Sequence, residues 1–207
     1  MVAAGCHEKT YWRCRPRVHV PVLTGAPLAQ DRLERIFEQF VQISDQSNCG
    51  LVSADFSVHY NADGILSLTF QVEGWGAHPS YSVEHVNLEI DTGEPLRFES
   101  VFRAGRLDGL LELLNAQLRK AVAKAPPLEG WESLAAETQA ARFQREHLNQ
   151  FVVLPEGLLF YYRFDYPHAV RAIQPDDTYV IPSTTAAKFV SPTGPLEWMR
   201  SRPRPMR

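Results

Sequence analysis

Histidine is the residue type in this chain best suited to catalysis or metal binding, and the chain contains seven. Imidazole is a common metal ligand and also acts as a general acid or base near neutral pH. His59, His78 and His85 lie on or beside neighbouring predicted strands, so they could converge on one metal ion. Their spacing matches no established ligand motif, and no two histidines are four residues apart on a helix. The alternatives are a metal-assisted hydrolase and histidines that are exposed or hydrogen-bonded; we favour the second and expect no metal site.

Motifs for other kinds of catalysis are missing from the sequence. It has no Gly-x-Ser-x-Gly segment, no glycine-rich phosphate loop and no His-Glu-x-x-His helix. It also has no Cys-x-x-Cys pair for redox or zinc chemistry. Asp176 and Asp177 are adjacent in a proline-flanked segment, and we expect a solvated loop there because neighbouring residues seldom point at one substrate. We therefore expect no catalytic residue, no cofactor and no enzymatic activity.

One short segment could serve recognition. In Gly74-Trp75-Gly76-Ala77-His78-Pro79, two glycines flank a tryptophan, and a histidine precedes a proline. Glycine permits positive φ and close backbone approach, which favours a shaped turn between strands. An exposed tryptophan is also a strong interface anchor, so the segment is alternatively a recognition loop.

Two amphipathic helices and several hairpins are predicted to position these residues. Apolar residues spaced three and four apart predict helices over residues 29–44 and about 107–123. Alternating residues predict a hairpin with one wet face, its strands around 53–60 and 66–73 and its turn at 61–64. A strand over 81–90 changes its apolar phase at Val83, which predicts a bulge near Glu84-His85. A second hairpin is expected at 151–164, and a last strand at 179–182.

The order of these elements favours an α+β fold. Because no regular alternation of strand and helix is present, we expect a largely antiparallel sheet built from hairpins, with the two main helices packed on it. The 207 residues are 44% hydrophobic and 22% charged, which excludes a disordered chain, a collagen or a coiled-coil rod. The formal net charge of −3 offers no basic field for nucleic acid. No run of 18 apolar residues predicts a transmembrane span.

Five segments, in order, match a known bacterial signature. Leu66–Phe70 followed by Gly74–Pro79 resembles "LSl…GGAH", Asn87–Leu96 resembles "n-D-tGk-l", and Ser100–Phe102 resembles "sDlF". Phe151–Tyr162 is similar to a final hairpin, and Val180–Pro182 to a terminal strand. The family they resemble is the RsiV-type domain, found in the ectodomain of the lysozyme-sensing anti-sigma factor and as an accessory domain of some peptidoglycan deacetylases. The resemblance covers about residues 18–191.

This chain departs from the family pattern in three places. Trp75 replaces the usual second glycine, Ser100-Val101 lacks the aspartate, and Tyr166-Pro167-His168 is an altered form of a tyrosine-rich loop. The resemblance nevertheless implies an α+β fold, an extracytoplasmic location and a role at peptidoglycan. It does not imply an anti-sigma factor or a deacetylase, because the chain carries neither a membrane span with a cytoplasmic segment nor a deacetylase domain.

The resemblance leads to a binding protein as the first functional hypothesis. Its partner would be a peptidoglycan hydrolase such as lysozyme, which it would recognise or inhibit as an immunity protein does, or the cell-wall glycan itself. A loop that blocks a glycosidase cleft faces two carboxylates, so it should offer hydrogen-bond donors and aromatic surface. The candidates are Trp75, His78, Tyr81, Tyr166 and His168. The alternatives are the metal-assisted envelope hydrolase and a structural envelope lipoprotein without separable activity.

Three cysteines leave one thiol without an intramolecular partner. Ala3-Ala4-Gly5-Cys6 resembles the end of a lipoprotein signal, which would make Cys6 a lipidation site on a periplasmic or outer-envelope protein. Because export permits disulfides, the remaining Cys14 and Cys49 are then expected to pair. We expect an N-terminal arm over residues 1–17, a single domain over 18–191 and a proline- and arginine-rich tail over 192–207, frayed from about residue 191.

Overall fold

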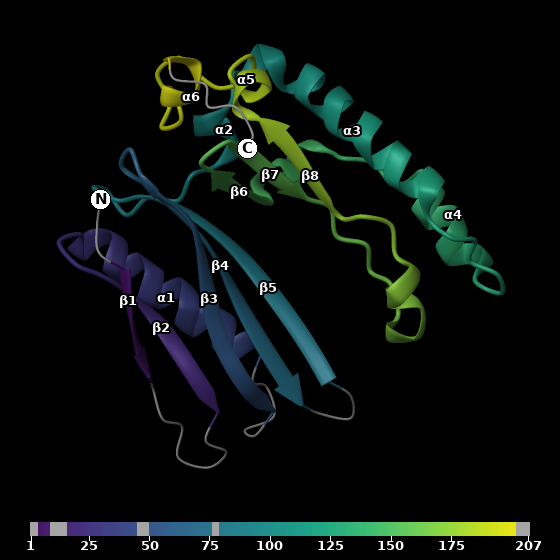
Figure 1. Cartoon of the computed structure of the whole chain (residues 1–207), viewed down its shortest axis with the longest axis horizontal. Helices are drawn as coiled ribbons and strands as arrows, with labels where there is room; N and C mark the ends of the chain where they lie inside the picture. Colours follow the sequence, from purple (N-terminus) through teal and green to yellow (C-terminus); the bar gives the residue numbers. More distant parts are fainter. Residues whose placement is uncertain (1–3, 9–15, 45–49, 76–78, 202–207) are drawn as a thin grey trace. The chain divides into compact units, whose positions relative to one another are not determined.

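The computed structural model describes residues 4–8, 16–44, 50–75 and 79–201. Figure 1 shows the course of the chain. Residues divide into two compact units, one of 1–96 with 152–155, the other of 97–151 with 156–207. Each unit is described by itself below. The prediction of a single domain stays a prediction.

The first unit is built on a sheet with the strand order β1-β2-β3-β4-β5. Strand β3 is antiparallel to β4 and β4 to β5, whereas β2 and β3 pair in parallel. The elements of this unit are β1 (Ala4–Glu8), β2 (Arg17–Leu23), α1 (Pro27–Ser44), β3 (Leu51–Ala62), β4 (Ile65–Trp75) and β5 (Pro79–Glu89).

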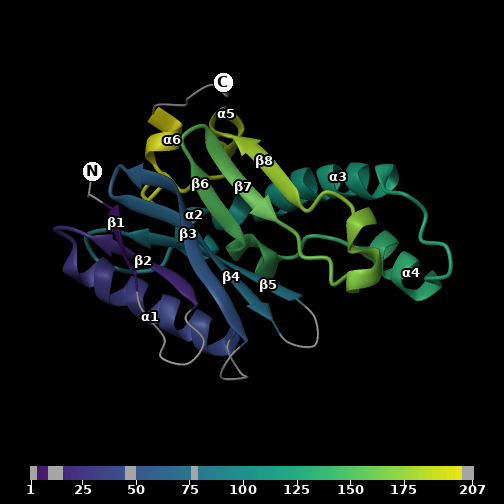
Figure 2. The ribbon, with the colours of Figure 1, turned by 60° about the horizontal axis from the view of Figure 1, so that its bottom comes forward.

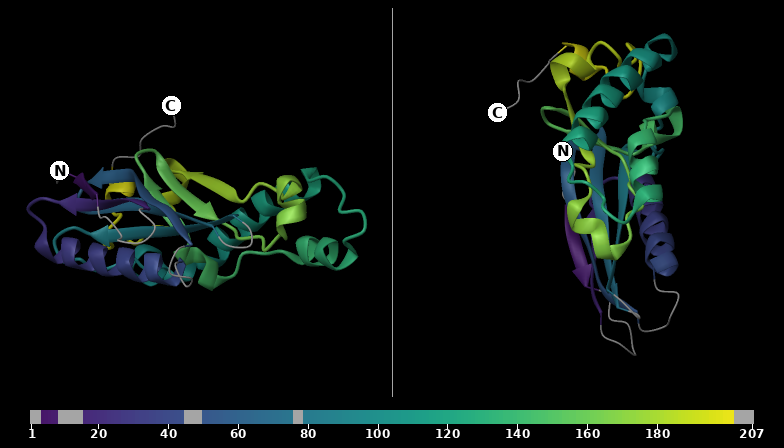
Figure 3. Two further views of the ribbon diagram at one scale, coloured as in Figure 1. Left: turned by 90° about the horizontal axis from the view of Figure 1, so that it is seen from below. Right: turned by 90° about the vertical axis from the view of Figure 1, so that its right-hand side faces the viewer.

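Helix α1 covers one face of this sheet (Figure 3, left). It begins at Pro27, a residue type that suits the first helical position because its missing N–H would have no intrahelical partner there. Its apolar stripe is buried against alternate residues of the strands, and the Phe37 and Phe70 rings lie 5.0 Å apart. The core comprises Val18, Val20, Leu23, Leu33, Phe37, Val41, Leu51, Ala54, Leu66, Leu68, Phe70, Val72, Val86 and Leu88, with smaller contributions around them. The predicted first helix is confirmed, beginning two residues earlier.

The predicted β3–β4 hairpin is present, and it closes through a two-residue turn. Ala62 pairs with Ile65, and both turn residues, Asp63 and Gly64, have positive φ, at 51° and 76°. Positive φ at both central positions matches the right-handed twist of the flanking strands, which explains the Asp-Gly sequence.

The bulge predicted near Glu84-His85 is wrong, because β4 and β5 pair without interruption. The register shifts instead on β3, between Leu51 and Ser53 and between Val58 and Tyr60. Val83 is opposite Gln71 and is 40% exposed, so the break in the apolar pattern marks a residue on the face away from α1. The second β3 shift turns the buried Tyr60 toward the face shared by its partner Ser67.

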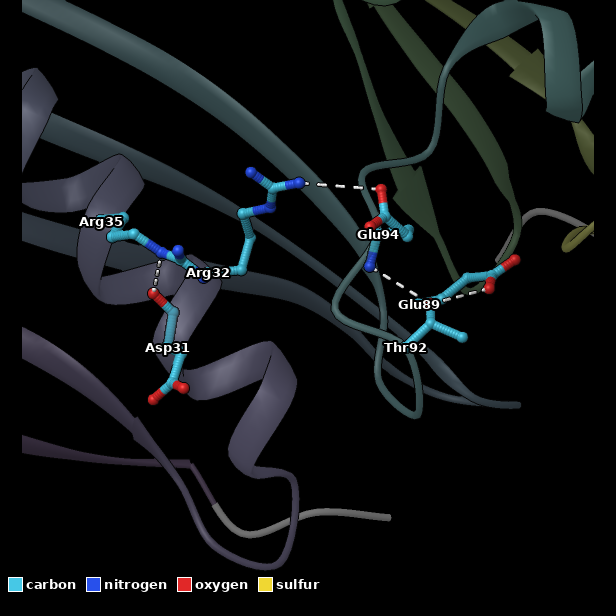
Figure 4. Close-up of polar contacts among 6 residues, drawn as sticks. All are labelled: Asp31, Arg32, Arg35, Glu89, Thr92 and Glu94. Atoms are coloured by element: carbon cyan, nitrogen blue, oxygen red, sulfur yellow. Dashed lines mark hydrogen bonds and ion pairs between the residues drawn. The ribbon is translucent and has the colours of Figure 1, made fainter.

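The turn after β5 is tied back to the start of α1 (Figure 4). Arg32 lies 3.6 Å from the Glu94 carboxylate, and the Thr92 hydroxyl donates to Glu89 at 3.1 Å and accepts from the Glu94 N–H at 3.2 Å. Gly93 has φ +70°, and a Cβ added there would meet the Leu28 carbonyl oxygen at 2.6 Å. The Asp91-Thr92-Gly93 segment of the family-like motif therefore packs closely against the start of α1, just after the end of β5.

The second unit contains the other long helix and the strands β7 and β8, which pair in antiparallel fashion (Figure 2). The second sheet has the order β6-β7-β8, and residues 152–154 of β6 are counted with the first unit. The remaining elements are α2 (Phe98–Val101), η1 (Ala104–Arg106), α3 (Leu107–Lys124), α4 (Glu132–Ala140), η2 (Arg145–Asn149), β6 (Phe151–Leu154), β7 (Gly157–Tyr161), η3 (His168–Ile173), β8 (Thr178–Pro182), α5 (Ser183–Ala186) and α6 (Trp198–Ser201). The fold is α+β with antiparallel hairpins, as predicted, but its strands form two sheets rather than one, with α1 on the first.

The chain does not fray from about residue 191. Leu196, Trp198 and Met199 are buried, and the short helix α6 ends at Ser201. The proline content of the C-terminal residues suggested a loose tail, but an apolar triplet preceding those prolines is held in the second unit's interior. Residues 202–207 lie outside the described part of the chain.

Candidate functional site

The sheet of the first unit has a second face, opposite α1, that presents exposed side chains near the β4–β5 connection. Trp75, at the end of β4, is 64% exposed, and Tyr81 on β5 is 51% exposed. Glu73 pairs directly with Tyr81, and Trp75 with Pro79, so these residues share one side of the pleated sheet. Two of the predicted partner-binding residues are thus together on one surface.

We call this surface the open face and define it as Ser53, Asp55, Gln71, Glu73, Trp75, Tyr81 and Val83. Asp55, Gln71 and Val83 form one row across three strands, and Ser53, Glu73 and Tyr81 form the next. Apart from the half-buried Ser53 and Gln71, these side chains are exposed. The open face therefore combines two aromatic rings with two carboxylates.

Hydrogen bonds and charge fix the polar groups on the open face. The Ser53 hydroxyl donates to a Glu73 carboxylate oxygen at 3.0 Å, and His19 Nδ1 lies 3.3 Å from the Asp55 carboxylate. Burial, with a smaller contribution from the Glu73 carboxylate, raises the pKa of the Tyr81 phenol above its ordinary value of 10. The phenol is consequently protonated near neutral pH and is available as a hydrogen-bond donor.

Two of the three histidines considered as metal ligands meet at one hydroxyl group. Thr69 Oγ1 lies 2.8 Å from His59 Nε2 and 2.9 Å from His85 Nδ1, on the side of the sheet that carries the open face. Burial lowers the pKa of His59, and burial together with neighbouring His59 lowers the pKa of His85 from 6.5 to about 4. A hydroxyl can donate to one ring and accept from the other, so this arrangement suits two neutral histidines. We call the row of His59, Thr69 and His85 the polar ladder.

The polar ladder continues into a buried pair beyond it. Ser67 donates to Asn87 Oδ1 at 2.6 Å and accepts a hydrogen bond from the Val153 N–H at 2.9 Å. Ser67, Thr69 and Asn87 are all buried. The face of the hairpin that was predicted to be solvent-exposed is therefore exposed at Asp55, Ser57 and Glu73 but buried at Ser67 and Thr69, where the Val153 backbone contacts Ser67.

Metal chemistry receives limited geometric support. Across residues 4–8, 16–44, 50–75 and 79–201, no group of three or more histidine, cysteine, aspartate or glutamate side chains could hold a metal ion. His59 and His85 are together as the metal hypothesis required, but they share a threonine, and His78 lies outside the described residues. The hypothesis stays untested without that third ligand.

Of the other three predicted binding residues, His78 lies outside the described residues, and Tyr166 and His168 belong to the second unit. Tyr166 is only 4% exposed, and its hydroxyl lies 2.8 Å from that of Thr138, so it serves as a buried hydrogen-bonding group. His168 begins the short helix η3 and is exposed. Asp176 and Asp177 are exposed as expected for a solvated loop. The open face accordingly includes neither Tyr166 nor His168.

The cysteine predictions lie largely beyond what can be described. Cys14 and Cys49 both lie outside the described residues, so their disulfide stays a prediction. Cys6 lies in β1, where its backbone pairs with Pro21 of β2. None of the helices formed by the described residues has the length and apolar character needed to cross a membrane.

Comparison with known proteins identifies the fold. No protein-family model matches the chain, and no curated protein sequence does. The structure is similar to a crystal structure of a DUF3298 family protein from Pseudomonas aeruginosa PAO1, with a TM-score of 0.57 and 15% identity over 93% of this chain and 94% of the other. It is also similar to a DUF3298 family member from Bacteroides fragilis, with a TM-score of 0.54 and 16% identity over 98% and 97%.

The chain has the fold of these DUF3298 proteins. At 15% and 16% identity the likeness concerns the fold alone. It extends over almost the entire length of both chains in each comparison.

Sequence reasoning missed part of the open face. Val83 was read as a sign of a bulge, although an apolar residue on the exposed parity of a strand is equally a sign of an outward contact residue. The alternation of residues over 66–73 places Thr69 on the polar face of the hairpin, but its position between two histidines depends on the strand register, which that alternation does not reveal.

Proposed function

We propose that this protein is an extracytoplasmic binding module that recognises, and by binding inhibits, a peptidoglycan hydrolase of the lysozyme type. The observation that carries the proposal is the open face, where Trp75 and Tyr81 stand exposed beside the carboxylates of Glu73 and Asp55. The segments that resemble RsiV-type domains supply the partner class, and those domains are related to the DUF3298 family.

The aromatic residues would provide most of the binding energy. Tryptophan and tyrosine are enriched among residues whose truncation costs the most at protein interfaces. Trp75 is the last residue of β4. Because β4 pairs with both β3 and β5, Trp75 is held on a strand rather than in a loop. A rigid aromatic anchor loses little conformational freedom on binding, which favours affinity.

The acidic residues would provide orientation and speed of association. Asp55 and Glu73 are both exposed on the open face, and the whole chain has a formal net charge of −3. Exposed charges of this kind steer a partner of opposite charge and change the association rate more than the final affinity. A basic hydrolase is the partner that this charge pattern favours.

The test is a binding and inhibition assay against a panel of purified lysozymes. Replacing Trp75 and Tyr81 with alanine should weaken binding at least about tenfold for each residue, the usual scale for an aromatic anchor. Trp131→Ala is the matched control, because Trp131 is 38% exposed but belongs to the second unit. Inhibition that is equally strong in all variants would remove the open face from the proposal.

Cell-wall glycan is the second candidate, and the two exposed rings favour it as well. Aromatic side chains present flat apolar surfaces with a polar edge, which suits contact with a sugar ring. Co-sedimentation with purified insoluble peptidoglycan, in the absence of any hydrolase, separates the two candidates. Binding to glycan alone, with no lysozyme inhibited, would replace the hydrolase as the partner.

Anchoring at the membrane surface through Cys6 is part of the same proposal. Mass spectrometry of the protein isolated from its native envelope tests it, because a lipidated Cys6 carries a diacylglyceryl mass. An unmodified Cys6 in envelope-purified protein would contradict the anchor without touching the binding proposal. Elemental analysis of the purified chain separately tests the metal-assisted hydrolase, which requires stoichiometric metal.

A further inference from the structure

Strand β5 is the last strand of the first unit's sheet, so among the described residues one of its edges has no neighbouring strand. A free edge presents N–H and C=O groups that can pair with another chain. The C-terminal end of β5 is already occupied, because Leu96 N–H donates to the Asn87 carbonyl and Glu89 N–H donates to the Glu94 carbonyl, both at 2.9 Å. The remaining edge runs from Pro79 toward His85.

The two bonds at Asn87 and Glu89 reveal which backbone groups point outward. Along a strand, successive residues direct their backbone groups to opposite edges. The register with β4 is uninterrupted from residue 79 to 89, so the alternation continues along the strand. Tyr81 and Val83 therefore direct their N–H and C=O groups away from β4, and no backbone partner for them occurs within the part of the chain described here.

This stretch lacks the features that usually protect an edge. Natural edge strands carry lysines, inward-pointing charges, bulges or prolines. The sequence Pro79-Ser80-Tyr81-Ser82-Val83 has no charged residue, and its proline stands at the first position of the strand. Tyr81 and Val83 are 51% and 40% exposed. Within the part of the chain that the structure describes, no strand is paired to this stretch of the edge.

We infer that β5 pairs with β5 of a second copy of this chain, in antiparallel fashion about a two-fold axis at Ser82. In this register Tyr81 lies opposite Val83 of the second copy, and Val83 opposite its Tyr81. Each such pair exchanges two backbone hydrogen bonds, which makes four in all. An aromatic residue opposite a β-branched residue is a favourable cross-strand pair.

Neighbouring registers fit less well. Centring the axis on Glu84 would place that carboxylate directly opposite its own copy, and like charges in that position are destabilising. Centring it on Tyr81 would place Val83 opposite Pro79, which has no N–H to donate. Centring it on Val83 would bring Ser82 opposite Glu84 and would need pairing by His85. In the Ser82-centred register the two central pairs, each of Tyr81 with Val83, both keep their N–H groups, and Pro79 lies opposite His85 only at the two ends of the paired segment.

Self-pairing would change the surface offered to a partner. Tyr81 and Val83 face the side of the sheet that carries the open face. Two copies joined through β5 would therefore present two open faces on one continuous sheet. Such a dimer would meet a polymeric or clustered target at two points, where effective concentration raises overall affinity.

Sedimentation equilibrium of the full chain under reducing conditions tests self-pairing without any hydrolase, so its outcome is independent of the proposed function. Four backbone bonds and a small contact area predict a weak dimer, with Kd on the order of 100 µM. Val83→Pro removes the outward N–H but leaves the pairing to β4, and proline is tolerated where an edge N–H faces solvent. It should raise Kd at least about tenfold. Val83→Thr retains the N–H and should change Kd by less than about threefold.

A charge exchange at Ser82 tests the register. Ser82 lies opposite itself in the Ser82-centred register, so Ser82→Glu should weaken self-association about threefold, and an equimolar mixture of Ser82→Glu with Ser82→Lys should associate more tightly than Ser82→Glu alone. Circular dichroism confirms that each variant is folded. A Ser82→Glu homodimer as tight as the wild type would overturn this register, because two glutamates directly opposite each other repel. A wild-type chain that stays monomeric at about 1 mM overturns self-pairing, as does a Val83→Pro dimer of unchanged affinity. If a monomeric chain shows protection of the Tyr81 and Val83 amides when the hydrolase is added, the edge belongs to that partner instead.

Discussion

Replacing His85 with asparagine should make the stability of this protein less sensitive to acid. The pKa of His85 falls from 6.5 to about 4 in the folded chain, mainly through burial and to a lesser extent through His59. Below pH 6.5 the unfolded chain therefore binds a proton that the folded chain does not. The resulting stabilisation is fully present above pH 6.5 and is lost as the pH falls toward 4.

The size of the effect follows from this difference. At about 1.4 kcal/mol for each pKa unit, a fall from 6.5 to about 4 corresponds to an upper figure of about 3 kcal/mol. The ring is partly accessible to solvent, which screens the interaction, so we expect about 2 kcal/mol between pH 7 and pH 4.5. Asparagine can still accept the hydrogen bond from Thr69 but takes up no proton in this range.

Urea unfolding followed by far-UV circular dichroism measures the difference. His85→Asn should lose about 2 kcal/mol less stability than the wild type between pH 7 and pH 4.5. His168→Asn, which removes an exposed histidine of the second unit, is the matched control for the loss of one imidazole. If His85→Asn and the wild type lose stability in parallel, His85 is not held neutral by its surroundings, and the account of the polar ladder is wrong.

Two further predictions concern stability. Gly93→Ala should lower the free energy of unfolding by about 2–4 kcal/mol, because the new Cβ meets the Leu28 carbonyl. Gly25→Ala should lower it by about 1 kcal/mol, because Gly25 has a similar positive φ but open space around it. Equal losses in urea titrations would show that φ alone decides the cost. Ser67→Ala should lower the free energy of unfolding by about 1–3 kcal/mol, because it leaves the buried Val153 N–H without the Ser67 acceptor. Ser57→Ala, at an exposed position, should stay within about 0.5 kcal/mol of wild type. A Ser67→Ala variant as stable as the wild type in the same assay would contradict the importance of that hydrogen bond.

Local patterns predicted most of the elements but not their pairing. The apolar spacing in α1 and the Asp63-Gly64 turn act within a few residues, so both were evident in the sequence. The shifts in β3 depend on how two strands align, and residue alternation carries no information on where an extra residue is accommodated. The apolar phase change at Val83 likewise predicts a bulge, whereas the β4–β5 register shows that Val83 is an exposed residue of a regular strand.

Burial of individual side chains also required the tertiary structure. Tyr166 lies in a polar, loop-like segment, which suggested exposure, but its hydroxyl reaches Thr138 in the interior. Trp75 and Tyr81 are only six residues apart in sequence, on the two strands that flank one connection. Their common face follows from the β4–β5 register.

The central claim is that the open face binds a lysozyme-type hydrolase, and isothermal titration of the chain against purified lysozymes tests it most directly. The account predicts that at least one lysozyme binds with Kd below about 1 µM and is inhibited. Binding should weaken at least about tenfold in Trp75→Ala and in Tyr81→Ala and should be unchanged in Trp131→Ala. No binding to any lysozyme at about 100 µM, or binding that is indifferent to Trp75 and Tyr81, would contradict the claim.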